Sequence, residues 1–291
     1  MKMKACVWWL LALVAAPAAA QTLTVEGVVS PAWVERGGQR LPVAAGMRLD
    51  NKDRVVTGDG ARLLLRLAEG SAVKLGENAT LALDGLAQEK GGDSRRLVTA
   101  ALDVVKGAFR FTTGIFESRP AGRDVKIRIR TVNAGIRGTD LWGKSDDKRD
   151  LVCLIEGKIS VAHPQAGEFT MADPLSFFVA PRDAKPLPVA PVNPKQLEEW
   201  AAETEIQPGS GALRRGGRVS VDAAVSGDQA AARAHLDKLR AAGYPAVMRT
   251  VKVADRAEYR VRVQSFPTQR DAAAAVEKLK ALGLTEAVVV K

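Results

Sequence analysis

The sequence predicts two domains of different fold class. Residues 21–180 read as an all-β domain, in the form of a sandwich, roll or short solenoid, and residues 218–291 read as an α/β domain. The first part alternates short apolar segments with glycine turns, whereas the second alternates strand and helix periods. Between them, residues 181–217 form a segment rich in proline and glycine. A chain of 291 residues is also long enough for about two domains.

Residues 1–20 have the pattern of a signal peptide. Lys2 and Lys4 form a basic start, an apolar run extends from Ala5 to Ala16, and Ala18 to Ala20 supplies the small residues that a signal peptidase needs. The apolar run is shorter than the about 20 residues that cross a bilayer. We therefore expect cleavage after Ala20, export to the periplasm and no membrane span.

The mature chain is basic and has a single cysteine. Loss of Lys2 and Lys4 takes the formal charge from +10 to +8, which favours an anionic partner. Export argues against nucleic acid and leaves the carboxylates of a cell wall or an anionic lipid surface. Cys153 lies in the apolar run from Leu151 to Ile155, so we expect a buried thiol in a strand and no intramolecular disulfide.

The proline-rich segment predicts a semi-rigid spacer interrupted by one helix. The helix is expected over Pro194 to Thr204, with Pro194 in its first turn and with Leu197 and Trp200 on one face. Residues 209–217 contain several glycines and two arginines, and they predict a flexible basic hinge before the second domain.

The first domain shows strand periods and no helical one. Residues 63–67 form a buried type of strand, residues 73–76 and 80–83 alternate as half-buried strands, and Val125 to Arg130 has a period of two with its basic residues on the solvent side. Closely spaced strands and turns of this kind are typical of all-β architectures.

Five segments of this domain are informative in their order: Val34 to Gly38, Leu49 to Gly58, Glu69 to Gly76, Val105 to Arg110 and Ala134 to Asp140. In this order they resemble the FecR-type domain, over most of residues 25–162. The founding members of that family relay a signal through a membrane helix to a cytoplasmic sigma-factor partner, and we expect neither that helix nor a cytoplasmic segment in this chain. The resemblance therefore implies at most a periplasmic protein partner. For Gly135 to Asp140 we favour a turn, with Asp140 bonding local amides, over a ligand site.

The second domain predicts six elements in the order strand, helix, strand, strand, helix, strand. We expect them at residues 218–224, 228–242, 246–253, 259–266, 269–282 and 286–291, with Ser226 and Asp228 as candidate caps of the first helix and Thr268 near the cap of the second. This βαββαβ order is ferredoxin-like: two helices cover one face of a four-stranded sheet, and the other face is open. Leu239 to Gly243 matches Leu279 to Gly283 in type and spacing, which indicates an internal repeat.

Three segments of the second domain are distinctive: Tyr259 to Phe266, Arg270 to Ala273 and Leu279 to Gly283. With them the chain resembles the SPOR family over residues 218–291. The resemblance implies that this domain binds peptidoglycan, and particularly glycan strands stripped of their stem peptides, through the open sheet face.

The candidate glycan-binding residues are Arg260, Arg262 and Gln264 on the third strand, with Ser220 and Asp222 on the first. Period-two alternation places the arginines on the face that the helices leave open, and a guanidinium suits paired hydrogen bonds to a carboxylate. Asp222 stands where the family usually has glutamine, so it is expected to pair with the arginines and to compete with a ligand. The alternative is a solvated face whose arginines only keep the open sheet soluble.

An enzyme, a cofactor and a metal site find no support in the sequence. His163 and His235 are the only histidines, and neither has metal-ligand neighbours at a suitable spacing. An RNA-binding sheet would need a pair of stacking aromatic residues, but Tyr259 is expected to face the helices. We therefore predict a non-enzymatic protein that binds glycan strands. The alternative is a periplasmic adaptor or sensor whose FecR-like domain binds a protein while the SPOR-like domain only localises it.

Overall fold

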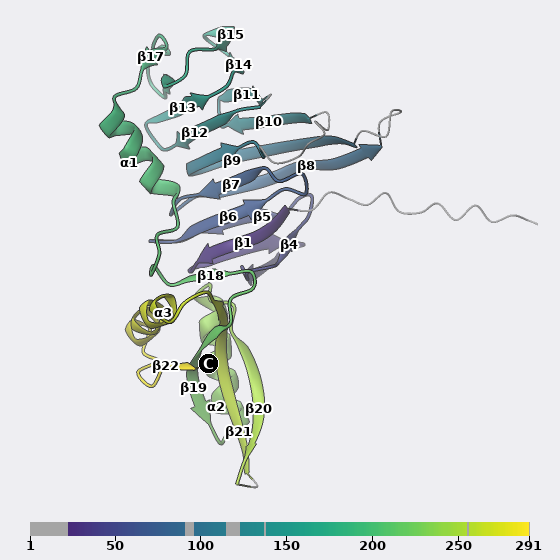
Figure 1. Ribbon diagram of the computed structural model, residues 1–291, viewed down its shortest axis with the longest axis vertical. Coiled ribbons are helices and arrows are strands. Elements are labelled where there is room, and N and C mark those ends of the chain that lie inside the picture. Colours follow the sequence, from purple (N-terminus) through teal and green to yellow (C-terminus); the bar gives the residue numbers. More distant parts are fainter. Residues whose placement is uncertain (1–22, 91–95, 115–122, 137, 255, 291) are drawn as a thin grey trace, which may run out of the picture.

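The computed structural model of the chain describes residues 23–90, 96–114, 123–136, 138–254 and 256–290 (Figure 1). The predicted signal peptide, residues 1–20, lies outside the described residues. Within the described ranges, no helix has both the length and the apolar character needed to cross a membrane.

The first part of the chain is built from two β-sheets that share one strand. The first sheet contains β1 (Leu23–Val29), β4 (Arg48–Leu49), β6 (Arg62–Arg66), β7 (Ala72–Leu75), β12 (Asp140–Ser145), β13 (Arg149–Glu156), β16 (Ser176–Pro181) and β17 (Ala190–Pro191). The second contains β2 (Ala32–Arg36), β3 (Gln39–Pro42), β5 (Arg54–Thr57), β8 (Thr80–Lys90), β10 (Arg123–Ile129), β11 (Val132–Ile136), β14 (Ile159–His163) and β15 (Gly167–Met171). All strand pairs are antiparallel in the described residues except that of β10 with the shared strand β9 (Arg96–Thr112).

Strand β9 passes from one sheet to the other at Gly107. Residues up to Lys106 pair with β8, whereas residues from Gly107 onward pair with β12. Gly107 has a φ of +89°, and a Cβ there would lie 2.4 Å from the Cβ of Ala79. Only glycine combines this backbone conformation with so close an approach, so it allows one strand to join the two sheets.

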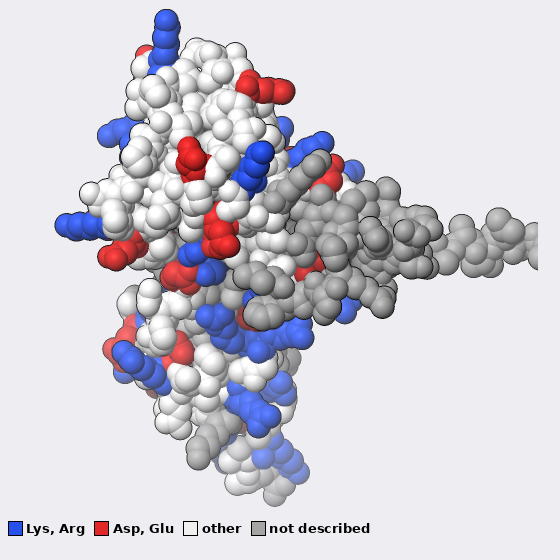
Figure 2. Space-filling view, turned by 45° about the horizontal axis from the view of Figure 1, so that its top comes forward, with Lys and Arg blue, Asp and Glu red and all other residues white. Residues whose placement is uncertain are grey.

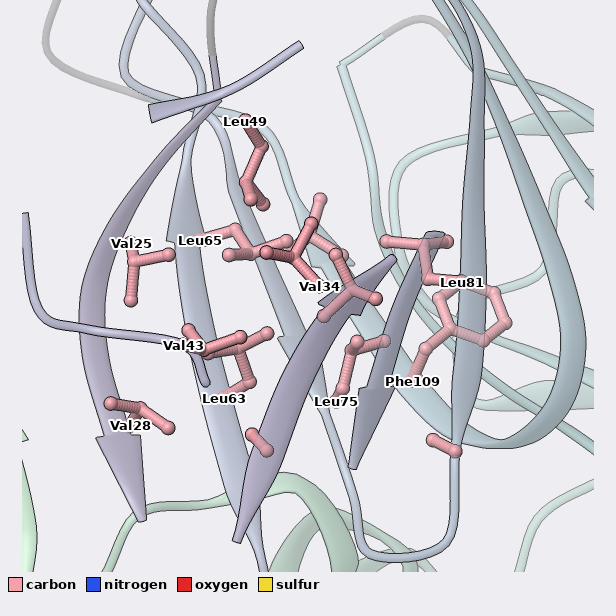
Figure 3. Packing of buried hydrophobic residues seen from close by; sticks show 14 of the residues in the cluster. Val25, Val28, Val34, Val43, Leu49, Leu63, Leu65, Leu75, Leu81 and Phe109 are labelled. Carbon is pink, nitrogen blue, oxygen red and sulfur yellow. The ribbon is translucent and has the colours of Figure 1, made fainter. Parts of the chain in front are cut away.

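The core of this domain comes from the alternation that the sequence shows. In β6, Leu63 and Leu65 are fully buried while their neighbours are not. Figure 3 shows these two side chains packed with Val25, Val34 and Phe109 from other strands. No helix occurs among the described residues of the range 23–181, as the absence of a helical period predicts.

Helix α1 (Pro194–Thr204) has the bounds predicted from the sequence. The side chain of Asn193 accepts a hydrogen bond from the Lys195 amide and caps the helix. Trp200 is stacked on Trp142 of β12, with 5.0 Å between ring centroids and 3° between the ring planes. The helix is therefore docked on the first sheet and does not lie free within a spacer.

The predicted flexible hinge is wrong for the residues that follow α1. Ala212–Arg214 form strand β18, which pairs with β1. The amides of Gly209 and Ala212 donate hydrogen bonds to Oδ1 of Asp271 in the second domain. These residues are held by both domains because their backbone groups find partners in each.

The second domain has the predicted order of elements. They are β19 (Val219–Ser226), α2 (Gln229–Ala241), β20 (Val247–Val253), β21 (Arg256–Phe266), α3 (Gln269–Ala281) and β22 (Val288–Val290). The four-stranded sheet has the order β20-β21-β19-β22, with every neighbouring pair antiparallel. Of the two candidate caps of the first helix, Asp228 is the one used, and Thr268 caps the second helix as predicted. Both helices contact the same sheet, and Figure 1 shows α2 behind its strands.

The two domains are packed together. The indole nitrogen of Trp33 donates to the carbonyl of Ala241 at 3.3 Å, and the Ala32 amide donates to the carbonyl of Gly243 at 3.3 Å. A Cβ on Gly243, whose φ is +80°, would lie 2.7 Å from the Trp33 ring. One cluster of buried apolar side chains also runs through both domains. Separation of the domains would therefore expose apolar surface on each of them.

Candidate functional site

The candidate site is the face of the four-stranded sheet that α2 and α3 do not cover. Residues directly opposite each other in neighbouring strands place their side chains on the same face. Val221, Val261 and Val263 are fully buried towards the helices. The alternate residues Ser220, Arg262 and Gln264 therefore lie on the open face, where Ser220 is paired with Gln264.

A β-bulge in β19 changes which residues reach this face. The register shifts between Asp222 and Ala224, so Asp222 is opposite Arg262 while Ala224 is opposite the buried Val261. Strict alternation along β19 would place Ala224 on the same face as Asp222, but the bulge inserts an extra residue and turns Ala224 to the buried side. Val225 takes the open-face position opposite Arg260 and is 43% exposed.

Arg262 and Asp222 form a paired ionic contact at the centre of the face. Nε of Arg262 donates to Oδ1 of Asp222 at 2.6 Å, and its Nη2 donates to Oδ2 at 3.0 Å. Asp222 is 3% exposed, so its carboxylate depends on these bonds for its polar partners. The hydrogen bonds that Arg262 donates to Asp222 raise the pKa of Arg262 above its ordinary value. The pairing of Asp222 with an arginine is thus present in the structure.

Arg260 is shared between two carboxylates. Its Nε donates to Glu258 at 2.6 Å, and its Nη1 lies 3.7 Å from Oδ2 of Asp222. Its side chain is 31% exposed, against 20% for Arg262. Of the two guanidinium groups, that of Arg260 is therefore the more accessible to a ligand.

Gln264 also lies on the open face, and its side chain contacts the neighbouring strand β20. Nη2 of Arg249 in β20 donates to Oε1 of Gln264 at 3.3 Å. Arg249 is opposite Arg260 across the β20–β21 pair, so it is a further cation on this face. Sequence reasoning did not select Arg249, although its place in the alternation of β20 is a usable signal. Figure 2 shows several Lys and Arg side chains over the lower part of the molecule, where the second domain lies.

Apolar side chains surround the charged groups. Val251, Val288 and Val225 are 37%, 52% and 43% exposed, and each is opposite an open-face residue in the neighbouring strand. The face therefore combines guanidinium groups with exposed valines. Such a surface can bind a ligand that carries both carboxylates and apolar patches, such as the faces of sugar rings.

In the first domain, the stretch from residue 134 to 140 includes the end of β11 and the first residue of β12, and Arg137 lies outside the described residues. Gly138 has a φ of +68°, which agrees with the turn interpretation. Asp140 accepts hydrogen bonds from Nε and Nη2 of Arg110 at 2.9 and 2.7 Å. Thr112 of β9 also donates to Asp140 through its hydroxyl at 3.4 Å, and among the described residues no backbone amide does so, in contrast to the prediction. Lys74 and Arg110 also pair with Glu205, which directly follows α1.

Within the part of the chain that the structure describes, no group of three or more His, Cys, Asp or Glu side chains could hold a metal ion. His163 ends β14, and its Nδ1 accepts from the Gln165 amide at 3.2 Å. Cys153 is a free cysteine in β13 and is fully buried, as predicted. Burial raises the pKa of its thiol to about 12.

Comparison with known proteins gives two family matches. Residues 216–291 match the model for "SPOR domain", and residues 53–160 match that for "FecR protein". Neither match indicates an enzymatic family. No curated protein matches the chain.

Two solved structures, at 1.65 and 2.50 Å, show a limited likeness. Each is described as a "putative anti-sigma factor" from Parabacteroides distasonis ATCC 8503. The first is 16% identical with a TM-score of 0.39, and the alignment covers 51% of this chain and 64% of that one. The second is 15% identical with the same TM-score, and the alignment covers 51% and 63%. The chain thus spans less than two thirds of the length of these proteins.

The two family matches agree with the resemblances seen in the sequence in both identity and order. The chain therefore carries a FecR domain at residues 53–160 followed by a SPOR domain at residues 216–291.

Proposed function

We propose that the protein is a non-enzymatic binder of peptidoglycan glycan strands, which it holds through the open sheet face of its SPOR domain. Arg260, Arg262 and Gln264 would contact the glycan, with Ser220 and Asp222 beside them. The observation that carries this proposal is the set of guanidinium groups on a sheet face that no helix covers. The strand order β20-β21-β19-β22 also supports a ferredoxin-like assignment for this domain.

The chemistry of a stripped glycan strand suits this face. Each muramic acid retains a lactyl carboxylate once the stem peptide is removed, and a guanidinium can hold a carboxylate by two hydrogen bonds. Gln264 can both donate to and accept from acetamido and hydroxyl groups. The exposed valines offer apolar surface to the sugar rings. Asp222 occupies Arg262 in the absence of ligand, so a ligand carboxylate must compete with it.

A periplasmic location belongs to the same proposal. Its support is the basic, apolar and small-residue pattern of residues 1–20. Cleavage after Ala20 would give a mature chain that starts at Gln21, and intact-mass measurement of protein from the cell envelope tests it. A mass that includes residues 1–20 would contradict this location.

Co-sedimentation of the whole protein with purified sacculi tests glycan binding. The variant to compare is Asp222→Asn with Arg260→Gln and Arg262→Gln, because removal of the arginines alone would leave the buried Asp222 carboxylate unpaired. This triple variant lowers the net charge by one. Arg233→Gln, on the exposed surface of α2, lowers it by the same amount and serves as the control.

The proposal expects the triple variant to lose sacculus binding while Arg233→Gln retains it. Binding should rise after an amidase has stripped the stem peptides, and it should fall with salt because exposed ionic contacts are screened. If the triple variant sediments as well as the unaltered protein, the arginines only keep the open sheet soluble.

A second candidate function rests on the FecR domain. In this alternative the protein is a periplasmic adaptor or sensor: the FecR domain binds a protein partner, and the SPOR domain only localises it. Crosslinking in cells distinguishes the two. A protein captured by both the unaltered chain and the triple variant would favour the adaptor, whereas a chain crosslinked only to cell wall would favour glycan binding alone.

A further inference from the structure

Strand β20 is the last strand of its sheet and has an unpaired outer edge. It pairs with β21 on one side, and no other described strand pairs with its opposite side. The strand is seven residues long and rich in valine. An exposed edge of this length presents a row of free backbone donors and acceptors, which is a template for pairing with another strand.

The β20–β21 hairpin also extends beyond the rest of the sheet, as Figure 1 shows. Towards the turn of the hairpin, the pairing of β21 with β19 ends at Tyr259, which is opposite Thr250 of β20. Beyond that point the hairpin has only two strands. Val251 and Val253 lie there and are 37% and 44% exposed. A two-stranded ribbon with exposed apolar side chains is marginally stable by itself, so a further strand on its edge would stabilise it.

The spacing of charges along β20 fits a second copy of the same strand. In an antiparallel pair centred on Thr250, Arg249 lies opposite Val251 of the other copy, and Lys252 lies opposite Met248. Val247 lies opposite Val253, so all seven residues of the strand are paired and every cation meets an uncharged residue. Like charges directly opposite each other destabilise a strand pair, and this register has none.

Neighbouring registers are less favourable. A pair centred on Arg249 places two arginines opposite each other, and one centred on Lys252 does the same with two lysines. A pair centred on Val251 avoids this, but residues 247 and 248 then extend past the partner strand. The sequence of β20 thus favours one symmetric register.

We propose that the outer edge of β20 is a homodimerisation edge, where two copies pair their β20 strands antiparallel about Thr250. The symmetry axis of such a pair runs perpendicular to the sheet, so the two four-stranded sheets become continuous and their open faces lie on the same side. A seven-residue strand pair is a small interface, and the dimer forms reversibly at high protein concentration. If the proposed glycan binding holds, both arginine faces can engage one glycan strand, and the two sites reinforce each other.

Disulfide trapping with single cysteines tests the register in the whole protein. In the proposed pair the two copies of residue 250 lie about 5 Å apart between Cα atoms. Thr250→Cys should therefore form a crosslinked dimer under mild oxidation, because a disulfide needs a Cα separation below about 7 Å. Val253→Cys is the control. In the proposed register Val253 is opposite Val247 of the other copy, so the two copies of residue 253 are six residues, or about 20 Å, apart along the strands. Cys153 is buried and does not interfere.

Sedimentation equilibrium tests the dimer itself. Val251→Lys places the new cation opposite Arg249 of the partner at two symmetric positions, while within its own chain it faces Glu258. The dissociation constant of the dimer should rise by about 2-fold to 30-fold, from two unfavourable cross-strand pairs. Val288→Lys adds the same charge at the other end of the open face, and it should leave the dimer unchanged.

Both measurements are made without cell wall, so they fail or succeed separately from the proposed glycan binding. The triple variant Asp222→Asn, Arg260→Gln, Arg262→Gln should still dimerise. A protein that remains a monomer at all concentrations, as it would if this edge bound a strand of another protein, overturns the inference. Equal crosslinking at positions 250 and 253 would overturn it too.

Discussion

Asp222 can either compete with a glycan carboxylate for Arg262 or orient Arg262 for the glycan, and Asp222→Asn distinguishes these two roles. The substitution keeps the shape of the side chain but removes the charge that Arg262 and Arg260 share. Two of these contacts are hydrogen bonds between charged groups, with lengths of 2.6 and 3.0 Å. If Asp222 competes with the ligand, its neutral form should release Arg262 to bind a glycan carboxylate.

Stability and binding should change in opposite directions. Hydrogen bonds between charged groups contribute about 1.5–3 kcal/mol each. The side-chain oxygen of asparagine is uncharged but can still accept one of the two bonds from Arg262. We therefore expect the free energy of unfolding to fall by about 1–3 kcal/mol. Release of Arg262 should strengthen glycan binding about tenfold, which corresponds to about 1.4 kcal/mol.

Denaturant unfolding and a binding isotherm with amidase-treated sacculi measure the two quantities. Asp237→Asn is the matched control, because Asp237 pairs with Arg233 on the exposed surface of α2. An exposed pair of this kind contributes about 0–1 kcal/mol, so neither stability nor binding should change much. Weaker glycan binding by Asp222→Asn would refute the reasoning, since it would mean that Asp222 orients Arg262 for the ligand.

Three further predictions concern the first domain and the helix α1 that is docked on it. Burial favours the neutral form of Asp150, but hydrogen bonds from Arg182, Thr131 and Ser145 outweigh it and hold the pKa of Asp150 below its ordinary value of 3.8. The ionised Asp150 carboxylate therefore contributes fully to stability above pH 3.8, and this contribution is lost as the pH falls through the lower pKa of the folded state. Asp150→Asn should remove this loss of stability from unfolding curves measured between about pH 2 and 5. An unchanged dependence of stability on pH would exclude this contribution of Asp150. Cys153, whose thiol pKa burial raises to about 12, should react slowly with a thiol reagent in the native protein and quickly in denaturant, whereas fast native labelling would indicate an exposed site. Trp200→Ala should release α1 from the sheet at a cost of about 3–5 kcal/mol, seen as faster proteolysis between residues 181 and 212; unaltered proteolysis would show that the ion pairs alone hold the helix.

The helix α1 shows what local pattern can and cannot predict. Pro194 and the apolar spacing of Leu197 and Trp200 are local signals, and they gave both ends of the helix. The stacking of Trp200 on Trp142 depends on residues distant in sequence, so no local pattern contains it. The pairing of β18 with β1 is similar, because its three residues form a strand only through a distant partner.

The sheet face on which Arg260 and Arg262 lie was predictable, but the register of the strands was not. Period-two alternation correctly separates Arg260 and Arg262 from the buried Val261 and Val263. It fails in β19 because a bulge follows Asp222, and bulges leave little trace in a sequence. The pairing of Asp222 with an arginine could be expected, but which arginine it would bind follows from the strand register alone.

The side-chain NMR signals of the arginines test the central claim most directly. The account predicts that stripped glycan fragments shift the Nε–H resonances of Arg260 and Arg262, because both groups would exchange carboxylate partners on the open face. Arg233 on α2 should show no shift. Glycan fragments that bind the protein but leave both open-face arginines unshifted would contradict the account.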